Sequence, residues 1–190
     1  MNNNIPGFVN KRKLDVIKKW IATLPDNINA VEVGSYCGLS AYTISNSLKK
    51  NSKLTCIDNF SLPVKEDAYK FVGIPVGYVG KNSKEHLLSY LKDCNNVEVL
   101  VGNGNDFEMN NVMFIFIDDG HFNPSFRNNL RHWWNLLSVG GIICGDDFYE
   151  YDYENKKLDV ISEVLNLANE FNLKIEIEEN LWKIIKEYNF

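Results

Sequence analysis

The sequence is poor in the features that mark membrane, secreted and nucleic-acid-binding proteins. Its apolar runs are of strand length, well below the roughly 18 residues needed to cross a membrane. The N-terminal stretch MNNNIPGFVNKRK has no apolar core of signal-peptide length. The 4 cysteines show no CxxC spacing, which favours reduced thiols and a cytoplasmic location. Basic residues number 20 against 25 acidic ones, and a net charge of -5 argues against a broad nucleic-acid surface.

The sequence does contain short apolar runs that alternate with amphipathic segments. A chain of 190 residues that is 45% hydrophobic can bury a sizeable core, so we expect one domain over 1–190 that opens with a helical segment in 1–28. The alternation predicts an α/β fold with a mostly parallel sheet and an antiparallel final hairpin. Strands are expected at 30–33, 53–57, 97–101, 114–117, 142–144, 173–177 and 181–185. Helices are expected at 11–24, at 40–50, at 83–92 with Ser83 as N-cap, from Pro124 with Asn123 as N-cap, and at 158–171.

Acidic residues follow two of these strands, in the stretch 114–148. The first strand is followed by 118–121 (DDGH) and the second by 146–147 (DD). A strand–helix–strand crossover makes the two strands parallel, so their carboxyl ends meet at the edge where open α/β sheets bind ligands. We predict a divalent cation held by three carboxylates, with a histidine that transfers a proton beside it: Asp118, Asp146, Asp147 and His121.

These acidic segments also have simpler interpretations. Asp146 and Asp147 would equally suit a turn or a helix cap, and His121 would suit the start of a helix. We interpret Asp119 as a solvated neighbour of the cluster. The segment Asn123-Pro124 is interpreted as a helix N-cap followed by the first helical residue, and not as part of a nucleic-acid methylation motif.

A glycine-containing turn follows the first strand. The turn, 34–40 (GSYCGLS), precedes a helix, so its backbone N–H groups can approach a ligand, and Asp58 ends the next strand, where it can accept hydrogen bonds from ribose hydroxyls. The full G-x-G-x-x-G fingerprint is missing because residue 36 is Tyr. This pairing is found in dinucleotide-binding and S-adenosylmethionine (SAM) enzymes, and a structural turn beside a surface aspartate is the simpler alternative.

A long connection, 59–81, separates the second strand from the helix at 83–92. Prolines and glycines punctuate it at Pro63, Gly73, Pro75, Gly77 and Gly80. Such a long segment inside a compact domain is usually functional, and we interpret it as a lid.

The motifs, taken in order, resemble those of class I SAM-dependent methyltransferases. VEVGSYCGLSAYTIS is similar to the first motif of that class, especially in its metal-dependent catechol O-methyltransferase branch. IDDGH and GGIICGDDF resemble the metal-site segments of that branch and of macrocin O-methyltransferase-like sugar methyltransferases, and LWKII resembles the closing strand of the latter. The resemblance runs from Val31 onward and implies a Rossmann-like class I fold, with a seven-stranded, mostly parallel sheet and helices on both faces.

The resemblance also implies roles for individual residues. Glu32 would face the SAM amino group, the 34–38 backbone its methionine part, Ser40 its carboxylate and Asp58 its ribose. Cofactor-binding positions are thus Glu32, Gly34, Ser35, Tyr36, Gly38, Ser40, Asp58, Gly104, Asn105 and Asp118. Asp118, Asp146 and Asp147 would bind Mg²⁺ or another divalent cation, and His121, with Asp118, would be catalytic.

The resulting functional prediction is Mg²⁺-assisted O-methylation of a small hydroxylated acceptor, a sugar or glycoside in preference to a catechol. Tyr149, Tyr151 and Tyr153 would serve either as a stacking rim for a sugar or as ordinary loop aromatics. We expect no nucleic-acid or membrane partner, and a second subunit is one candidate for covering the cleft. Two alternatives remain: an NAD-type oxidoreductase, and a nucleotide-binding protein without catalysis.

Overall fold

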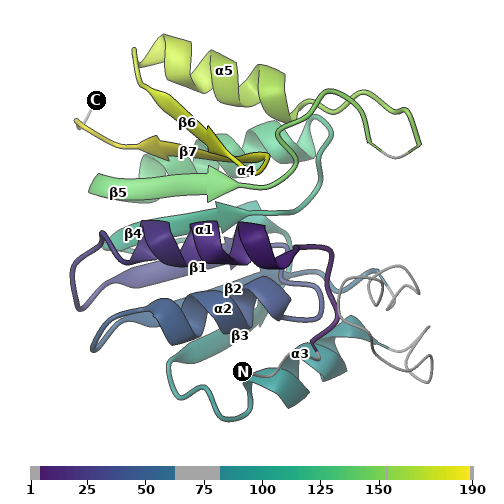
Figure 1. Ribbon diagram of the computed structural model, residues 1–190, viewed down its shortest axis with the longest axis vertical. Helices are drawn as coiled ribbons and strands as arrows, with labels where there is room; N and C mark the ends of the chain where they lie inside the picture. The colour runs from purple at the N-terminus through teal and green to yellow at the C-terminus, as the bar shows by residue number, and fades with distance from the viewer. Residues whose placement is uncertain (1–4, 63–81, 153, 189–190) are drawn as a thin grey trace.

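A computed structural model describes residues 5–62, 82–152 and 154–188 as a seven-stranded sheet with helices on both faces (Figure 1). The predicted lid lies outside the described residues except for 59–62. In the described part of the chain, no helix is long and apolar enough to span a bilayer.

The sheet has the order β3-β2-β1-β4-β5-β7-β6. The first five strands in this order pair in parallel, and β7 pairs antiparallel with both β5 and β6. The predicted fold class, including the closing hairpin, is therefore confirmed. The strands are β1 Asn29–Val33, β2 Lys53–Asp58, β3 Val97–Val101, β4 Val112–Ile117, β5 Leu137–Gly145, β6 Ile175–Glu178 and β7 Leu181–Ile185.

Two apolar cores, one on each face, explain why the central strands are hydrophobic throughout. On β4, Phe114 and Phe116 pack into one core, and Ile115 and Ile117 pack into the other. Figure 1 shows α1 and α2 in front of the sheet and α4 behind it. On the face of Phe114 and Phe116 the helices are α1 Lys11–Ile21, α2 Leu39–Ser47 and α3 Ser83–Leu91. On the opposite face they are α4 Ser125–Leu136 and α5 Val160–Glu170.

Strand register determines which residues meet at the carboxyl edge of the sheet. Val33 of β1 pairs with Ile57 of β2 and with Ile117 of β4, and Ile117 pairs with Gly145 of β5. The residues that follow these partners therefore lie side by side at this edge: Gly34, Asp58, Asp118 and Asp146. The strand order reverses between β1 and β4, which is where ligands bind in open α/β sheets.

Two N-cap predictions were wrong. Asn123 does not cap α4, because its side chain Nδ2 donates to Glu163 Oε1 at 2.8 Å and the helix begins after Pro124. Asn82, rather than Ser83, caps α3, since its Oδ1 accepts from the Lys84 N–H at 2.9 Å. At α4 a tertiary hydrogen bond replaced the expected cap, and at α3 the preceding residue took the capping position.

The strand β5 is longer than predicted. It starts at Leu137, directly after α4, and continues through the Gly140–Gly141 pair into the predicted strand 142–144. Gly140 remains part of β5 because its N–H donates to Lys186 O at 2.7 Å. Its φ of +80° is readily adopted only by glycine.

Candidate active site

The turn between β1 and α2 lies against the end of β4. Gly34 has φ +90°, and a Cβ added to it would lie 2.2 Å from Asp118 O. Gly34 N donates to Ile57 O and Asp118 N to Val33 O, each at 2.8 Å. Gly38, at φ +92°, starts α2 and faces Leu87 of α3. The two glycines thus permit a close approach of two backbone segments at the strand-order reversal.

The side chain of Asp58 is held by main-chain N–H groups. Its Oδ2 accepts from Tyr36 N at 2.7 Å and its Oδ1 from Phe60 N at 2.6 Å. Each carboxylate oxygen can accept a second hydrogen bond. Asp58 is therefore fixed at the end of β2 as an acceptor.

Glu32 is a fully buried carboxylate near the end of β1. Its side chain is 0% exposed, and neither of its oxygens has a hydrogen-bond partner among the described residues. Burial raises the pKa of Glu32 to about 7, although the nearby Ser35 and Ser40 hydroxyls act to lower it. A buried carboxylate is costly unless a cation or donors approach it. This site therefore fits a ligand with a positively charged amino group.

The other predicted cofactor residues surround this edge of the sheet. Ser35 and Ser40 are buried, at 2% and 5% exposure, on either side of Gly38. Gly104 starts the short 3-10 helix Gly104–Asp106 and lies beside the end of β1, since a Cβ added to it would be 2.4 Å from Val33 Cγ1. Asn105, next to it, is exposed.

A second group gathers three side chains after β4 and β5. Candidate ligand atoms of Asp118, His121 and Asp147 all lie within 4.8 Å of one another. His121 Nε2 is 2.8 Å from Asp147 Oδ2 and 3.6 Å from Asp118 Oδ1. The Tyr149 hydroxyl donates to the other Asp147 oxygen. We call Asp118, His121 and Asp147 the acidic cluster.

The acidic cluster holds His121 in its charged form. Burial lowers the pKa of this imidazole, but hydrogen bonds and charge from Asp118 and Asp147 outweigh burial and raise it to about 10. Burial likewise acts to raise the pKa of Asp147, but the contact with His121 lowers it overall. The imidazolium therefore neutralises part of the negative charge of the two carboxylates.

Asp146, the third predicted metal ligand, points to a different partner. It is 5% exposed, and its Oδ1 accepts from Lys13 Nζ of α1 and from Asp147 N, the latter at 2.6 Å. Burial and the nearby Asp118 raise the pKa of Asp146 to about 7, although Lys13 acts in the opposite direction. The structure thus groups Asp118 and Asp147 with His121, and Asp146 with Lys13.

Lys13 is a site residue that the sequence analysis missed. It lies 133 positions from Asp146 in the chain, so no local motif links the two. A weak signal was present, because Lys11, Arg12 and Lys13 fill the first turn of α1, where the helix dipole disfavours positive charge.

Two further expectations are corrected or limited. Asp119 lies outside the acidic cluster and is only partly exposed: its Oδ2 accepts from Asn129 Nδ2 at 3.5 Å, and burial raises its pKa. Among the loop tyrosines, Tyr149 binds Asp147, Tyr151 is 50% exposed, and Tyr153 lies outside the described residues.

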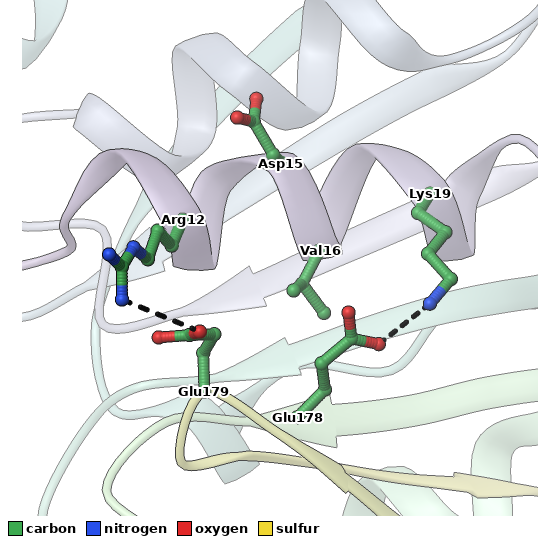
Figure 2. A pocket seen from close by; sticks show the side chains of 6 residues that line it. All are labelled: Arg12, Asp15, Val16, Lys19, Glu178 and Glu179. Carbon is green, nitrogen blue, oxygen red and sulfur yellow. Dashed lines mark hydrogen bonds and ion pairs between the residues drawn. The ribbon is translucent and has the colours of Figure 1, made fainter.

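A separate hollow lies between α1 and the turn that joins β6 to β7 (Figure 2). Two ion pairs border it, Arg12–Glu179 at 4.0 Å and Lys19–Glu178 at 2.7 Å. Val16 lies between them, and none of the predicted site residues lines this hollow. Its charges are already paired and largely solvated, so we assign it no role in the chemistry.

Comparison with known proteins bears on the identity of the fold. Residues 31–148 match the model of a methyltransferase domain family. A comparison with curated protein sequences gives no match. Because the family match covers the turn after β1 and both acidic segments, it includes most of the candidate site.

Several solved structures share the fold at low sequence identity. The O-methyltransferase TomG of Streptomyces achromogenes, involved in tomaymycin synthesis and bound to SAM, has a TM-score of 0.64 and 11% identity over 95% of this chain and 82% of its own. An O-methyltransferase from Bacillus cereus bound to SAH gives 0.63 and 14%, over 96% and 84%. An rRNA methylase from Streptococcus thermophilus gives 0.64 and 14%, over 95% and 100%.

These similarities favour methyl transfer over the oxidoreductase alternative, since the family model and these solved neighbours are methyltransferases. The chain belongs to the methyltransferase domain family and has the Rossmann-like fold of class I SAM-dependent methyltransferases.

Proposed function

We propose that the protein transfers a methyl group from SAM to a hydroxyl of a small acceptor, with the help of Mg²⁺ or another divalent cation. The observation that carries this proposal is the adjacency of two sites at one sheet edge. Gly34, beside the buried Glu32, is in van der Waals contact with the backbone of Asp118, which belongs to the acidic cluster. A cofactor at the first site would therefore lie next to a hydroxyl held at the second.

The first site suits SAM in charge and shape. The unpartnered Glu32 carboxylate would receive the ammonium group, and the 34–38 backbone, with Ser35, Tyr36 and Ser40, would line the methionine part. Asp58 has free acceptor capacity for the ribose hydroxyls, and Gly104 with Asn105 would flank the adenine.

The acidic cluster suits a hard divalent cation. Carboxylate oxygens are the ligands that Mg²⁺ prefers, and Asp118 and Asp147 provide two of them within one small space, with Asp146 nearby. When bound, such an ion lowers the pKa of an acceptor hydroxyl and fixes its direction. His121 is protonated while it contacts Asp118 and Asp147; with these carboxylates turned to a cation, the neutral imidazole would be placed to take the hydroxyl proton.

The chain's own geometry would supply much of the remaining rate enhancement. Methyl transfer from a sulfonium is an in-line displacement, so acceptor oxygen, methyl carbon and sulfur have to be aligned. Alignment of this kind contributes about 7–11 kcal/mol. Gly34 and Asp118, fixed to each other by strand register, set the relative position of the two binding sites.

The acceptor class follows from the ligands that the cation would still need. Two adjacent hydroxyls would complete an octahedral coordination sphere, which favours a sugar or glycoside, with a catechol as the second choice. Tyr151, 50% exposed in the segment between β5 and α5, would provide a stacking surface. The net charge of -5 disfavours an RNA acceptor such as that of the rRNA methylase neighbour.

The proposal is tested by transfer of radiolabelled methyl from SAM to a panel of sugars, glycosides, catechols and an rRNA fragment, with EDTA or with Mg²⁺. We expect transfer to at least one vicinal diol, loss of that transfer in EDTA and recovery on adding Mg²⁺. Lys19→Met, which removes only an exposed ion pair on α1, is the matched control and should leave activity unchanged.

Full activity in EDTA would rule out the metal part of the proposal. Transfer to RNA alone would rule out the acceptor class, and calorimetric binding of NAD tighter than that of SAM would rule out methyl transfer itself.

A further inference from the structure

Lys13 makes an ion pair unlike the others of its helix. The side chains of Lys13 and Asp146 are 12% and 6% exposed. By contrast, Lys19 and Glu178, an ion pair of the same helix, are 66% and 44% exposed. Exposed pairs contribute little to stability, whereas breaking a buried pair leaves an uncompensated charge. The Lys13–Asp146 contact is therefore a fixed part of the site's architecture.

The packing of α1 holds Lys13 over the end of β5. Asn10 caps the helix by accepting from Lys13 N at 3.1 Å, and Ile17 and Trp20 anchor it in the core of the front face. Figure 1 shows the first turn of α1 at the side of the sheet toward which the arrowheads of β4 and β5 point. Lys13 thus reaches the site from a rigid helix, although the helix dipole disfavours a cation in the first turn.

Asp146 connects Lys13 to the acidic cluster. Its Oδ1 accepts both from Lys13 Nζ and from Asp147 N, which is 2.6 Å away. Asp147 adopts a left-handed backbone conformation, with φ +58°, that turns its carboxylate toward His121. A contact chain therefore runs from Lys13 through Asp146 to the backbone of a cluster carboxylate.

The charges of these residues indicate what the contact between Lys13 and Asp146 does. Asp118, Asp146 and Asp147 together carry three negative charges when ionised, and Lys13 neutralises the Asp146 charge. When His121 is neutral, as it must be to accept a proton, the two carboxylates that remain match the charge of a divalent cation. Asp118 and Asp147 also share the compact cluster with His121, and Asp146 is outside it.

We infer that Lys13 is a positioning residue: it reserves Asp146 as a support for Asp147 and so restricts the carboxylate ligands of the divalent cation to Asp118 and Asp147. The inference rests on the proposed metal site. The alternative is that Lys13 stands in for the cation and is displaced when the ion binds, with Asp146 then serving as a ligand.

Lysine reactivity separates these two arrangements in the wild-type protein. The full chain is acetylated with and without saturating Mg²⁺, and modification at each lysine is measured by mass spectrometry. We expect Lys13 to stay protected in both conditions and Lys19, which is 66% exposed, to react in both. Acetylation of Lys13 that increases severalfold with Mg²⁺ would overturn the inference.

Metal affinity provides the second readout. Mn²⁺ binding is measured by calorimetry for the wild type and for Asp118→Asn, Asp146→Asn and Asp147→Asn, with SAH affinity as the test of folding. We expect affinity to fall roughly a thousandfold for Asp118→Asn and Asp147→Asn, as for lost ligands, and about tenfold for Asp146→Asn, as for a supporting residue.

Equal losses in all three variants would make Asp146 a ligand and overturn the inference, while the metal part of the proposed function would stand. A wild type that binds no Mn²⁺ would overturn both. If Asp146→Asn fails to fold, the acetylation experiment on the wild type still decides the question.

Discussion

The proposed cofactor side and the proposed acceptor side of this sheet edge are formed by different kinds of groups. On the cofactor side, a continuous segment, 32–40, supplies backbone and one buried acid, and Asp58 and Gly104 lie next to it. On the acceptor side, charged side chains arrive from α1, β4 and β5, and most of them already neutralise one another. One half is defined by local chain geometry and the other by pairing between distant segments.

This difference predicts which kind of substitution each side should tolerate. Close backbone approach at Gly34 leaves no room for a side chain, so the cofactor side is sensitive to shape. The acceptor side has to balance several charges in a partly buried space, so it is sensitive to the loss of any single charge. The following predictions test this contrast, from the largest expected effect to the smallest.

The largest effect is expected from His121→Gln. The variant keeps a polar side chain of similar size but loses the base, so kcat should fall about 10³-fold, within the range for general base catalysis. The measurement is steady-state methyl transfer, with SAH affinity by calorimetry as the control. An unchanged kcat would mean that the acidic cluster serves structure alone, and unchanged SAH affinity would show that the cofactor side is independent of it.

Gly34→Ala should destabilise the fold by about 4 kcal/mol, because the new Cβ would lie 2.2 Å from Asp118 O on a backbone with φ +90°. Gly140→Ala is the matched control: its φ is +80°, but the nearest atom to its Cβ would be Met113 Cε at 3.9 Å. Its cost should be about 1 kcal/mol, from backbone conformation alone. Urea unfolding of both variants measures the difference, and similar costs would refute the close-approach argument.

Glu32→Gln should change how stability depends on pH. Burial raises the folded-state pKa of Glu32 from 4.5 to about 7, so between these values the folded state keeps a proton that the unfolded state releases. The stability contributed by the protonated group is therefore lost as pH rises through this window, by about 3 kcal/mol above pH 7. The variant should equal the wild type near pH 4.5 and exceed it at pH 8.

Urea unfolding at a series of pH values, without cofactor, tests this prediction. Glu98→Gln, on the exposed part of β3, removes the same charge and should leave the pH profile parallel to that of the wild type. A Glu32→Gln profile that also stays parallel would show that Glu32 is compensated in the folded protein. Saturating SAM should stabilise the wild type more than the variant, because the variant lacks the counter-charge for the ammonium group.

Much of the fold was readable from the sequence because local patterns and topology agreed. The strands at Val97–Val101 and Leu181–Ile185 were predicted with their observed bounds. Turn-forming residues flank the first apolar run on both sides, and Asn180 directly precedes the second. The bounds failed where tertiary contacts replaced local rules. The Asn123 side chain binds Glu163 instead of capping the helix. The strand β5 continues through Gly140 because Lys186, directly after β7, accepts its hydrogen bond.

The candidate site divides in the same way. The glycine turn and Asp58 are local features, and their adjacency follows from parallel pairing of β1 and β2, which the chain order alone predicts. The lid predicted over 59–81 remains a prediction, since residues 63–81 lie outside the described part of the chain. The roles of the cofactor and metal residues also remain predictions, to be tested by the experiments above.

The sequence by itself determined the order of strands and helices, the two apolar faces of the central strands and the convergence of Gly34, Asp58, Asp118 and Asp146 at one edge. These follow from hydrophobic periodicity and from the handedness of parallel crossovers, which act on neighbouring segments. Only the tertiary structure decided that Asp146 pairs with Lys13, and that Asp118 and Asp147 enclose His121. The energy of an ion pair depends on the distance between its charges, and the distance from Lys13 to Asp146 depends on how α1 packs across the sheet.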